Sequence, residues 1–151
     1  MNISFREITL DDARSVEDIA TNARAEAIPS LNEIYNQDER LRFYRNEILF
    51  KSGFVALNES SDVIGFILFV DGEIDHLYMK ENYRGLGIGQ TLLQMAISAM
   101  DSEEVFLFMF QENTRALGFY LKNGFEIVFA GDGRNNEEGL PDFKLTKPLW
   151  V

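Results

Sequence analysis

One short stretch of the chain, Arg84-Gly85-Leu86-Gly87-Ile88-Gly89, carries glycine at every second position. The residues before it, 74–79, predict a short strand, and those after it, 88–100, predict a helix. A turn of this kind leaves backbone N–H groups free at the positive end of a helix dipole, where they can bind an anion such as phosphate. Glycine suits it because no side chain keeps the anion from the backbone. A tight turn without a ligand is the alternative, and the stretch alone favours neither.

Two common nucleotide-binding motifs do not fit this spacing. A dinucleotide fingerprint, G-x-G-x-x-G, counted from Gly85 would require glycine where Gln90 stands. A Walker loop requires Lys and then Ser or Thr after its last glycine, and Gln90-Thr91 supplies only the second. The stretch therefore indicates a different kind of phosphate site, if it binds phosphate at all.

Composition excludes several kinds of chemistry. The 151 residues contain no cysteine, which excludes disulfides, thiolate zinc sites and a cysteine nucleophile. His76 is the single histidine, which disfavours a histidine metal site or a Ser-His-Asp triad. The formal net charge of −11 disfavours nucleic acid as a partner and suits a cationic acceptor such as an amine.

The chain shows no targeting or membrane signal. Its start has neither the charged nor the apolar region of a signal peptide, and the longest apolar run, Val63 to Val70, is too short to span a bilayer. We therefore expect no membrane partner and a cytoplasmic location. The length predicts a single domain, residues 1–151.

The hydrophobic pattern predicts alternating strands and helices. Strands are expected at 3–8, 53–57, 63–70, 73–79, 105–110, 125–130 and 142–147, and helices at 13–23, 88–100 and 113–123. A looser helical pattern runs from Pro29 to Phe50. The wholly apolar strand at 105–110 is expected to be central and covered on both faces. The predicted fold class is α+β: a mixed, mostly antiparallel sheet with helices on its faces.

Two motifs and the order of elements carry a family resemblance. Arg84, Gly87 and Gly89 match the Arg/Gln-x-x-Gly-x-Gly/Ala signature of the GNAT superfamily of acetyltransferases. The segment Asn113-x-x-Ala-x-x-Phe-Tyr-x-Lys-x-Gly-Phe125 resembles the family's Asn…Ala…Phe-Tyr…Gly-Phe helix. The predicted order of strands and helices is similar to that of this superfamily over essentially the whole chain. The run Asp75-His76-Leu77-Tyr78 is similar to a bacterial branch of it.

The resemblance implies an acetyl-CoA-dependent N-acetyltransferase that uses no metal. It implies that backbone N–H groups of the glycine stretch hold the coenzyme A pyrophosphate. The pantetheine arm would pair with the end of the preceding strand, where the next strand in the sheet splays away. The residues implied in coenzyme binding are Leu77, Tyr78, Met79, Arg84, Gly85, Leu86, Gly87, Ile88, Gly89, Gln90, Asn113, Phe119 and Tyr120.

Given this resemblance, Tyr120 is the expected general acid. Coenzyme A leaves as a thiolate whose conjugate acid has a pKa of about 8.5, and a neutral phenol with a pKa of about 10 can donate to it at pH 7. A tyrosine packed on its helix face is the alternative interpretation.

The acceptor amine also needs a base, because an alkylamine with a pKa of about 10.4 is neutral in roughly one molecule in 2500 at pH 7. The glutamate that some family members use corresponds to Phe108 here, so that role does not carry over. Glu73 and Asp75 alternate on one face of the predicted strand, with His76 on the opposite face. Asp75, acting through a water, is the candidate base, and His76 is expected to be a hydrogen-bonded sheet residue.

The acceptor is expected to be a small-molecule or peptide amine that binds near Ile28 to Tyr35. Glu137 and Glu138 are either acids that recognise it or solvated loop charges. Two functions fit the sequence. One is an N-acetyltransferase with direct attack in a ternary complex, and the other is a non-catalytic acyl-CoA-binding or sensor module. Either function is compatible with a homodimer.

Overall fold

The computed structural model describes residues 2–150, so the two end residues of the predicted domain 1–151 lie outside the described part. Within it the strands are β1 (Ser4–Glu7), β2 (Ser52–Leu57), β3 (Val63–Val70), β4 (Glu73–Met79), β5 (Glu104–Phe110), β6 (Glu126–Gly131) and β7 (Asp142–Pro148). The α-helices are α1 (Ala13–Ala27), α2 (Gln37–Phe50), α3 (Ile88–Ser98) and α4 (Thr114–Lys122). Short 3-10 turns, η1 (Leu10–Asp12) and η2 (Glu81–Tyr83), precede α1 and α3.

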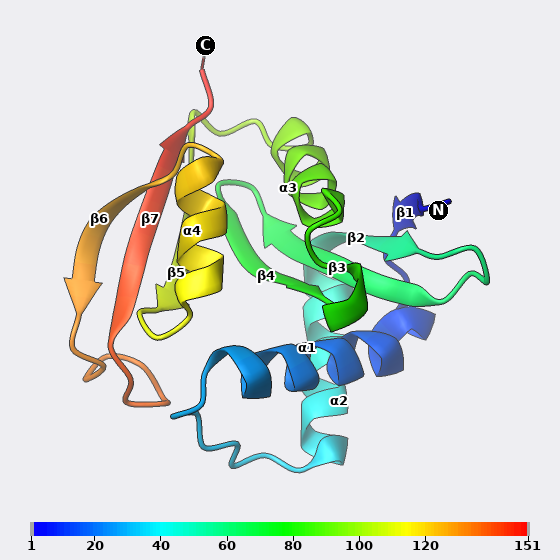
Figure 1. Ribbon diagram of the computed structural model, residues 1–151, viewed down its shortest axis with the longest axis horizontal. Coiled ribbons are helices and arrows are strands. Elements are labelled where there is room, and N and C mark those ends of the chain that lie inside the picture. Colours follow the sequence, from blue (N-terminus) through cyan, green and yellow to red (C-terminus); the bar gives the residue numbers. More distant parts are fainter. Residues whose placement is uncertain (1, 151) are drawn as a thin grey trace.

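The strands form one sheet in the order β1-β2-β3-β4-β5-β7-β6. β4 and β5 run parallel, and the other neighbouring strands are antiparallel. Helices lie on both sides of the sheet, with α1 and α2 on one side and α3 and α4 on the other (Figure 1). The predicted α+β architecture, with a mixed and mostly antiparallel sheet, is confirmed.

Each side of the sheet has its own hydrophobic core. α3 and α4 pack on one face, around Leu92, Leu93 and Leu107, and α1 and α2 pack on the other, around Val16 and Phe66. β3 serves both cores because successive side chains of a strand point to opposite faces. Its residues are buried from Val63 to Phe69 as a result.

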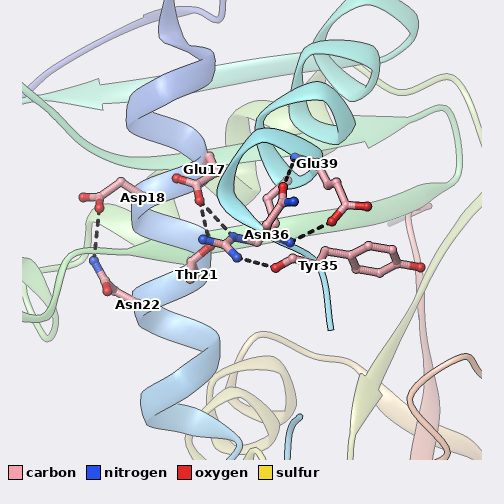
Figure 2. Close-up of polar contacts among 8 residues, drawn as sticks. Glu17, Asp18, Thr21, Asn22, Tyr35, Asn36 and Glu39 are labelled. Atoms are coloured by element: carbon pink, nitrogen blue, oxygen red, sulfur yellow. Dashed lines mark hydrogen bonds and ion pairs between the residues drawn. The ribbon is translucent and has the colours of Figure 1, made fainter. Parts of the chain in front are cut away.

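The helical pattern predicted from Pro29 to Phe50 is wrong in its first part, because α2 begins only at Gln37. Asn36 Oδ1 accepts a hydrogen bond from the Glu39 N–H at 2.9 Å, and Glu39 Oε1 accepts one from the Asn36 N–H at 2.9 Å. This capping box starts the helix there. Figure 2 shows the pair beside Tyr35 and opposite Glu17 of α1. Residues 29–36, which we name the α1–α2 segment, are non-helical.

The expectation that β5 is covered on both faces is also wrong. Val105 and Leu107 are buried under the α3 and α4 side, but Phe108 is 55% exposed on the other side. There α1 and α2 cover β2, β3 and β4 instead (Figure 1). The Lys144 ammonium of β7 lies 4.7 Å from the ring centroid of Phe106, a cation–π contact that covers part of this apolar face.

Candidate functional site

The glycine turn, Arg84–Gly89, connects η2 to α3. Gly85 and Gly87 have φ angles of 77° and 81°, in the left-handed region that glycine adopts without strain. A Cβ at either position would meet no atom within 4 Å, so both open onto free space. Gly87 is the N-cap of α3, and the first N–H groups of a helix have no acceptor within it. The turn therefore has the local geometry of an anion site, and its residues fit a pyrophosphate.

The charged side chain of the glycine turn is paired with a residue of α1. Arg84 Nη1 lies 2.7 Å from Glu26 Oε1 in the last turn of α1, and Arg115 Nη1 at the start of α4 lies 3.4 Å from the same oxygen. Ile88 is buried in the core under α3, whereas Leu86 is 53% exposed. What the turn offers to a ligand is therefore mainly backbone.

β4 and β5 separate directly beyond their first contact. The two strands share one paired position, Glu73 with Phe106, within residues 2–150. Residues Leu77 to Met79 pair with β3 on one side and have no β5 partner on the other. A cavity of about 260 Å³ lies in the gap, lined by β4, β5 and α4, and we name it the strand cavity. Unpaired backbone beside this cavity is what the predicted pantetheine contact requires.

Tyr120 of α4 lines the strand cavity. Its side chain is 7% exposed and lies edge-on to the rings of Phe119 and Phe125, with centroids 5.2 and 5.3 Å away. Burial, with a smaller contribution from Tyr78, raises the pKa of the Tyr120 hydroxyl above its ordinary value. The phenol is therefore protonated at neutral pH. Within the described residues no hydrogen bond engages its hydroxyl.

The two sequence motifs meet beside this cavity. A Cβ on Gly89 of the glycine turn would lie 3.7 Å from the Phe119 ring of α4, so the two segments approach closely here. Asn113 caps α4 by accepting the Ala116 N–H at 3.2 Å, and it also lines the strand cavity with Leu77 and Tyr78. Met79 packs against the core under α3.

A second and larger cavity adjoins the first. It has a volume of about 610 Å³ and is lined by the α1–α2 segment, the start of α2 and residues 137–138 of the β6–β7 loop, and we name it the loop cavity. Three residues line both cavities: Arg24, His76 and Glu138. The predicted acceptor region near Ile28 to Tyr35 therefore contributes to a cavity that reaches the strand cavity.

Polar contacts join the two loops that form the loop cavity. The Tyr35 hydroxyl donates a hydrogen bond to Glu137, and Arg24 Nη2 lies 3.5 Å from Glu138 Oε2. The Ser30 N–H donates to Glu112 Oε1 at 2.7 Å, which fastens the α1–α2 segment to the turn before α4. Glu137 and Glu138 thus have partners across the cavity and are also exposed to solvent, so acceptor recognition by these residues stays a prediction.

His76 is a hydrogen-bonded residue of β4, as predicted, but the predicted facing of Asp75 and His76 needs correction. The pairing of β3 with β4 shifts register between Leu68 and Phe69, so that Asp75 is an extra residue in β4. A bulge of this kind re-aims side chains. Lys51 Nζ lies 2.8 Å from both Asp75 Oδ2 and Glu47 Oε1, and Glu47 Oε1 lies 2.8 Å from His76 Nε2. Asp75 and His76 therefore both face α2, not opposite sides.

A protein-family model described as "Acetyltransferase (GNAT) family" matches residues 14–125. The chain belongs to the acetyltransferase (GNAT) family. The match includes the glycine turn and all of α4, and the fold described above is the GNAT fold.

Curated relatives of this GNAT chain are N-acetyltransferases. The peptidyl-lysine N-acetyltransferase YjaB of Escherichia coli (strain K12) is 34% identical over 49% of this chain and 49% of its own length. The spermidine N(1)-acetyltransferase of Thermoplasma acidophilum is 28% identical over 84% of this chain and 90% of its own length. The chain spans about half the length of the YjaB enzymes that it matches.

Solved structures show the same GNAT fold. The apo form of YjaB from Escherichia coli has a TM-score of 0.76 at 23% identity, covering 97% of each chain. PaiA N-acetyltransferase from Thermoplasma acidophilum, crystallised in complex with coenzyme A, has a TM-score of 0.72 at 25% identity, covering 98% of this chain and 99% of that one.

Three residues of this site were missed by sequence reasoning: Arg24, Glu47 and His76 as a cavity residue. Arg24 and Glu47 lie in helices, and charged residues in a helix usually lie on its solvated face, so the sequence did not single them out. One signal in the sequence concerned His76, which is that it is the single histidine of the chain. Nothing in the sequence signals its pairing with Glu47, 29 residues away.

Proposed function

We propose that the protein is an N-acetyltransferase that moves an acetyl group from acetyl-CoA to a primary amine by direct attack in a ternary complex. The observation that carries this proposal is the meeting of two cavities at Arg24, His76 and Glu138. One cavity lies between the splayed strands β4 and β5, and the other is lined by the α1–α2 segment and the β6–β7 loop. A thioester held in the first would lie next to an amine held in the second.

Acetyl-CoA would bind chiefly through backbone. The free N–H groups of the glycine turn would hold the pyrophosphate at the positive end of α3. The pantetheine amides would pair with the unpaired edge of Leu77 to Met79, as an added strand does. Family membership and the coenzyme A complex of PaiA support this donor.

Starting from the ammonium form of the acceptor, the reaction needs two protons removed from the nitrogen, one before and one after its attack, and the negative charge on the leaving sulfur stabilised. The amine nitrogen attacks the carbonyl carbon of the acetyl thioester, the carbon–sulfur bond breaks, and coenzyme A leaves as a thiolate. Tyr120 would donate to that sulfur. Because burial raises the pKa of Tyr120 above that of a free phenol, its contribution is best described as a hydrogen bond to the thiolate, with proton transfer completed later. The chain has no cysteine that could carry an acyl intermediate.

For the base, Asp75 acting through a water is the candidate from the sequence. It lines the strand cavity, and its carboxylate is paired with Lys51. His76 is the second candidate, and unlike Asp75 it lines both cavities.

The acceptor class is a primary amine on an aliphatic chain, in a small molecule or a peptide. The names of the relatives support it, since one acts on peptidyl-lysine and another on spermidine. Four carboxylates line the loop cavity, from Glu33, Glu39, Glu137 and Glu138, together with three arginines. Two of the arginines, Arg24 and Arg40, are paired with Glu138 and Glu17. The exposed aromatic rings of Tyr35 and Phe43 suit an alkylammonium.

A thiol-release assay with acetyl-CoA tests the proposal against a panel of spermidine, lysine peptides and simple alkylamines. We expect release that requires the amine, with an acetylated product by mass spectrometry. Tight acetyl-CoA binding without turnover on any amine would instead support the acyl-CoA-binding or sensor module.

The location of the protein stays a sequence-based prediction. Among residues 2–150, no helix combines the length and the apolar character that crossing a bilayer requires. The cytoplasmic location can be checked by fractionation of the source cell.

A further inference from the structure

We propose that His76, oriented by Glu47, accepts the proton of the acceptor amine. This inference rests on the proposed function, and it assigns a named base to a reaction that the sequence left without one. It replaces a water-mediated role of Asp75 as the first candidate.

His76 occupies the junction of the two cavities. Its side chain is 12% exposed, and it lines both the strand cavity and the loop cavity. An amine that enters through the loop cavity and approaches a thioester in the strand cavity must pass this position. The imidazole is therefore close to the atom that loses its proton.

The imidazole is held in one orientation. Nε2 lies 2.8 Å from Glu47 Oε1, and the rings of Phe43, Tyr44 and Tyr78 surround it with centroids 5.9, 5.4 and 6.4 Å away. The hydrogen bond assigns the proton to Nε2 in the neutral ring, because the ionised carboxylate can only accept. Within residues 2–150 the imidazole makes no other hydrogen bond. The lone pair of Nδ1 is therefore available to take a proton.

Glu47 is suited to support this transfer. Burial alone would raise the pKa of Glu47, but hydrogen bonds from His76 and Lys51 outweigh it and hold the pKa below its ordinary value. An ionised carboxylate on Nε2 fixes the tautomer and stabilises the imidazolium once Nδ1 has taken a proton. The charged and titratable groups around His76 are Glu47, Lys51 and Tyr44 from α2 and its end, Asp75 and Tyr78 from β4, Arg24 from α1, and Arg42 and Glu138 at the loop cavity.

The protons released in the reaction go to His76 and to solvent. The ammonium of the acceptor transfers one proton to Nδ1 of His76, and the neutral nitrogen attacks the thioester carbonyl. A proton that leaves the nitrogen as the carbon–sulfur bond breaks goes to solvent, and the thiolate is stabilised by Tyr120. His76 returns its proton to water before the next turnover.

Neither nearby carboxylate is better placed. Asp75 is paired with Lys51 and Glu138 with Arg24, so each already has a cationic partner. A base is most effective when its pKa is near the working pH, and imidazole is the side chain whose ordinary pKa is near neutral.

The test combines kinetics with NMR. We expect His76→Gln to lower kcat for an alkylamine by roughly 10²–10⁴-fold with the Kd of acetyl-CoA unchanged. The deficit should shrink as the pH rises toward the pKa of the amine, because solvent then supplies the neutral nucleophile. Glu47→Gln should lower kcat less and shift the acid limb of the pH profile. Glu59→Gln, in the exposed β2–β3 turn, is the matched control and should match wild type.

Because the chain has one histidine, its imidazole ¹⁵N signals need no assignment. We expect the neutral ring of the wild type to carry its proton on Nε2, with Nδ1 unprotonated. A proton on Nδ1, or His76→Gln with wild-type kcat and pH profile, would overturn the proposal. If Asp75→Asn abolishes turnover while His76→Gln does not, the base is Asp75. Inactivity of the wild type itself toward every amine marks a failure of the proposed function, not of the base assignment alone.

Discussion

Glu73 of β4 and Phe106 of β5 are the one paired position between two parallel strands that otherwise diverge, within residues 2–150. The strand cavity and the glycine turn lie toward the carboxyl end of β4 from that pair. The strand cavity occupies the gap, the glycine turn lies past the end of β4, and α4 brings Tyr120 to the cavity wall. The site therefore exists because the sheet opens at this point.

Tyr120→Phe removes the hydroxyl and keeps the buried ring. We expect kcat to fall roughly 10²–10⁴-fold, because the leaving thiolate loses its donor, with the Kd of acetyl-CoA nearly unchanged. Steady-state kinetics and isothermal titration check both. Since burial raises the pKa of Tyr120, turnover of the wild type should show no alkaline loss attributable to this residue below about pH 10. Unchanged turnover in the variant would remove Tyr120 from the mechanism.

Gly87→Asp should weaken acetyl-CoA binding, because a charged side chain enters the space where the pyrophosphate would lie. Gly87→Ala separates the backbone strain at a φ of 81° from the charge and should lose less. Gly139→Asp, at a φ of 69° in the β6–β7 loop, carries the same charge and a similar strain away from the turn. The pyrophosphate assignment fails if Gly87→Asp binds acetyl-CoA as tightly as the Gly139 variant.

Glu47→Gln should make folding less sensitive to acid. Glu47 has a pKa below its ordinary value of about 4.3, so its contribution to stability is present above that pH and is lost as the pH falls through the folded-state pKa. We expect a cost of about 1–3 kcal/mol at pH 7, because Lys51 and His76 then face a neutral amide in place of an ionised carboxylate. Urea melts at a series of pH values should show the gap between wild type and variant closing below about pH 4.3. A gap that is constant with pH would contradict this.

Tyr35→Phe should release the contact between the α1–α2 segment and the β6–β7 loop. One hydrogen bond of this kind contributes about 0.5–1.5 kcal/mol, which corresponds to roughly a two- to tenfold rise in KM for the acceptor. The Kd of acetyl-CoA should not change. Glu137→Ala, which removes the acceptor, and the double variant complete a cycle, in which the double variant should lose little more than either single one. Full additivity would show that the two side chains act independently.

The spacing of residues in the sequence was sufficient to predict those parts of the structure that depend on residues close together in the chain. The glycine turn, the Asn113–Phe125 helix, the strand and helix order and the family follow from patterns within a few residues, because turn conformation and the period of buried positions are local properties. The start of α2 was misplaced even so. Leu31, Ile34 and Tyr35 suggested a helix, but the capping box at Asn36 and Glu39 starts it later.

The surroundings of His76 depend on contacts that no local pattern encodes. A one-residue bulge at Asp75 changes which way the β4 side chains face, and it is set by the pairing of β4 with β3. Glu47 reaches His76 from 29 residues away, and Arg24 and Glu138 meet from opposite ends of the chain. The sequence by itself determined the fold family and the glycine turn. Only the packing of α2 against the bulged strand brings Glu47 to His76 at the junction of the two cavities, because that contact depends on register and distance in three dimensions.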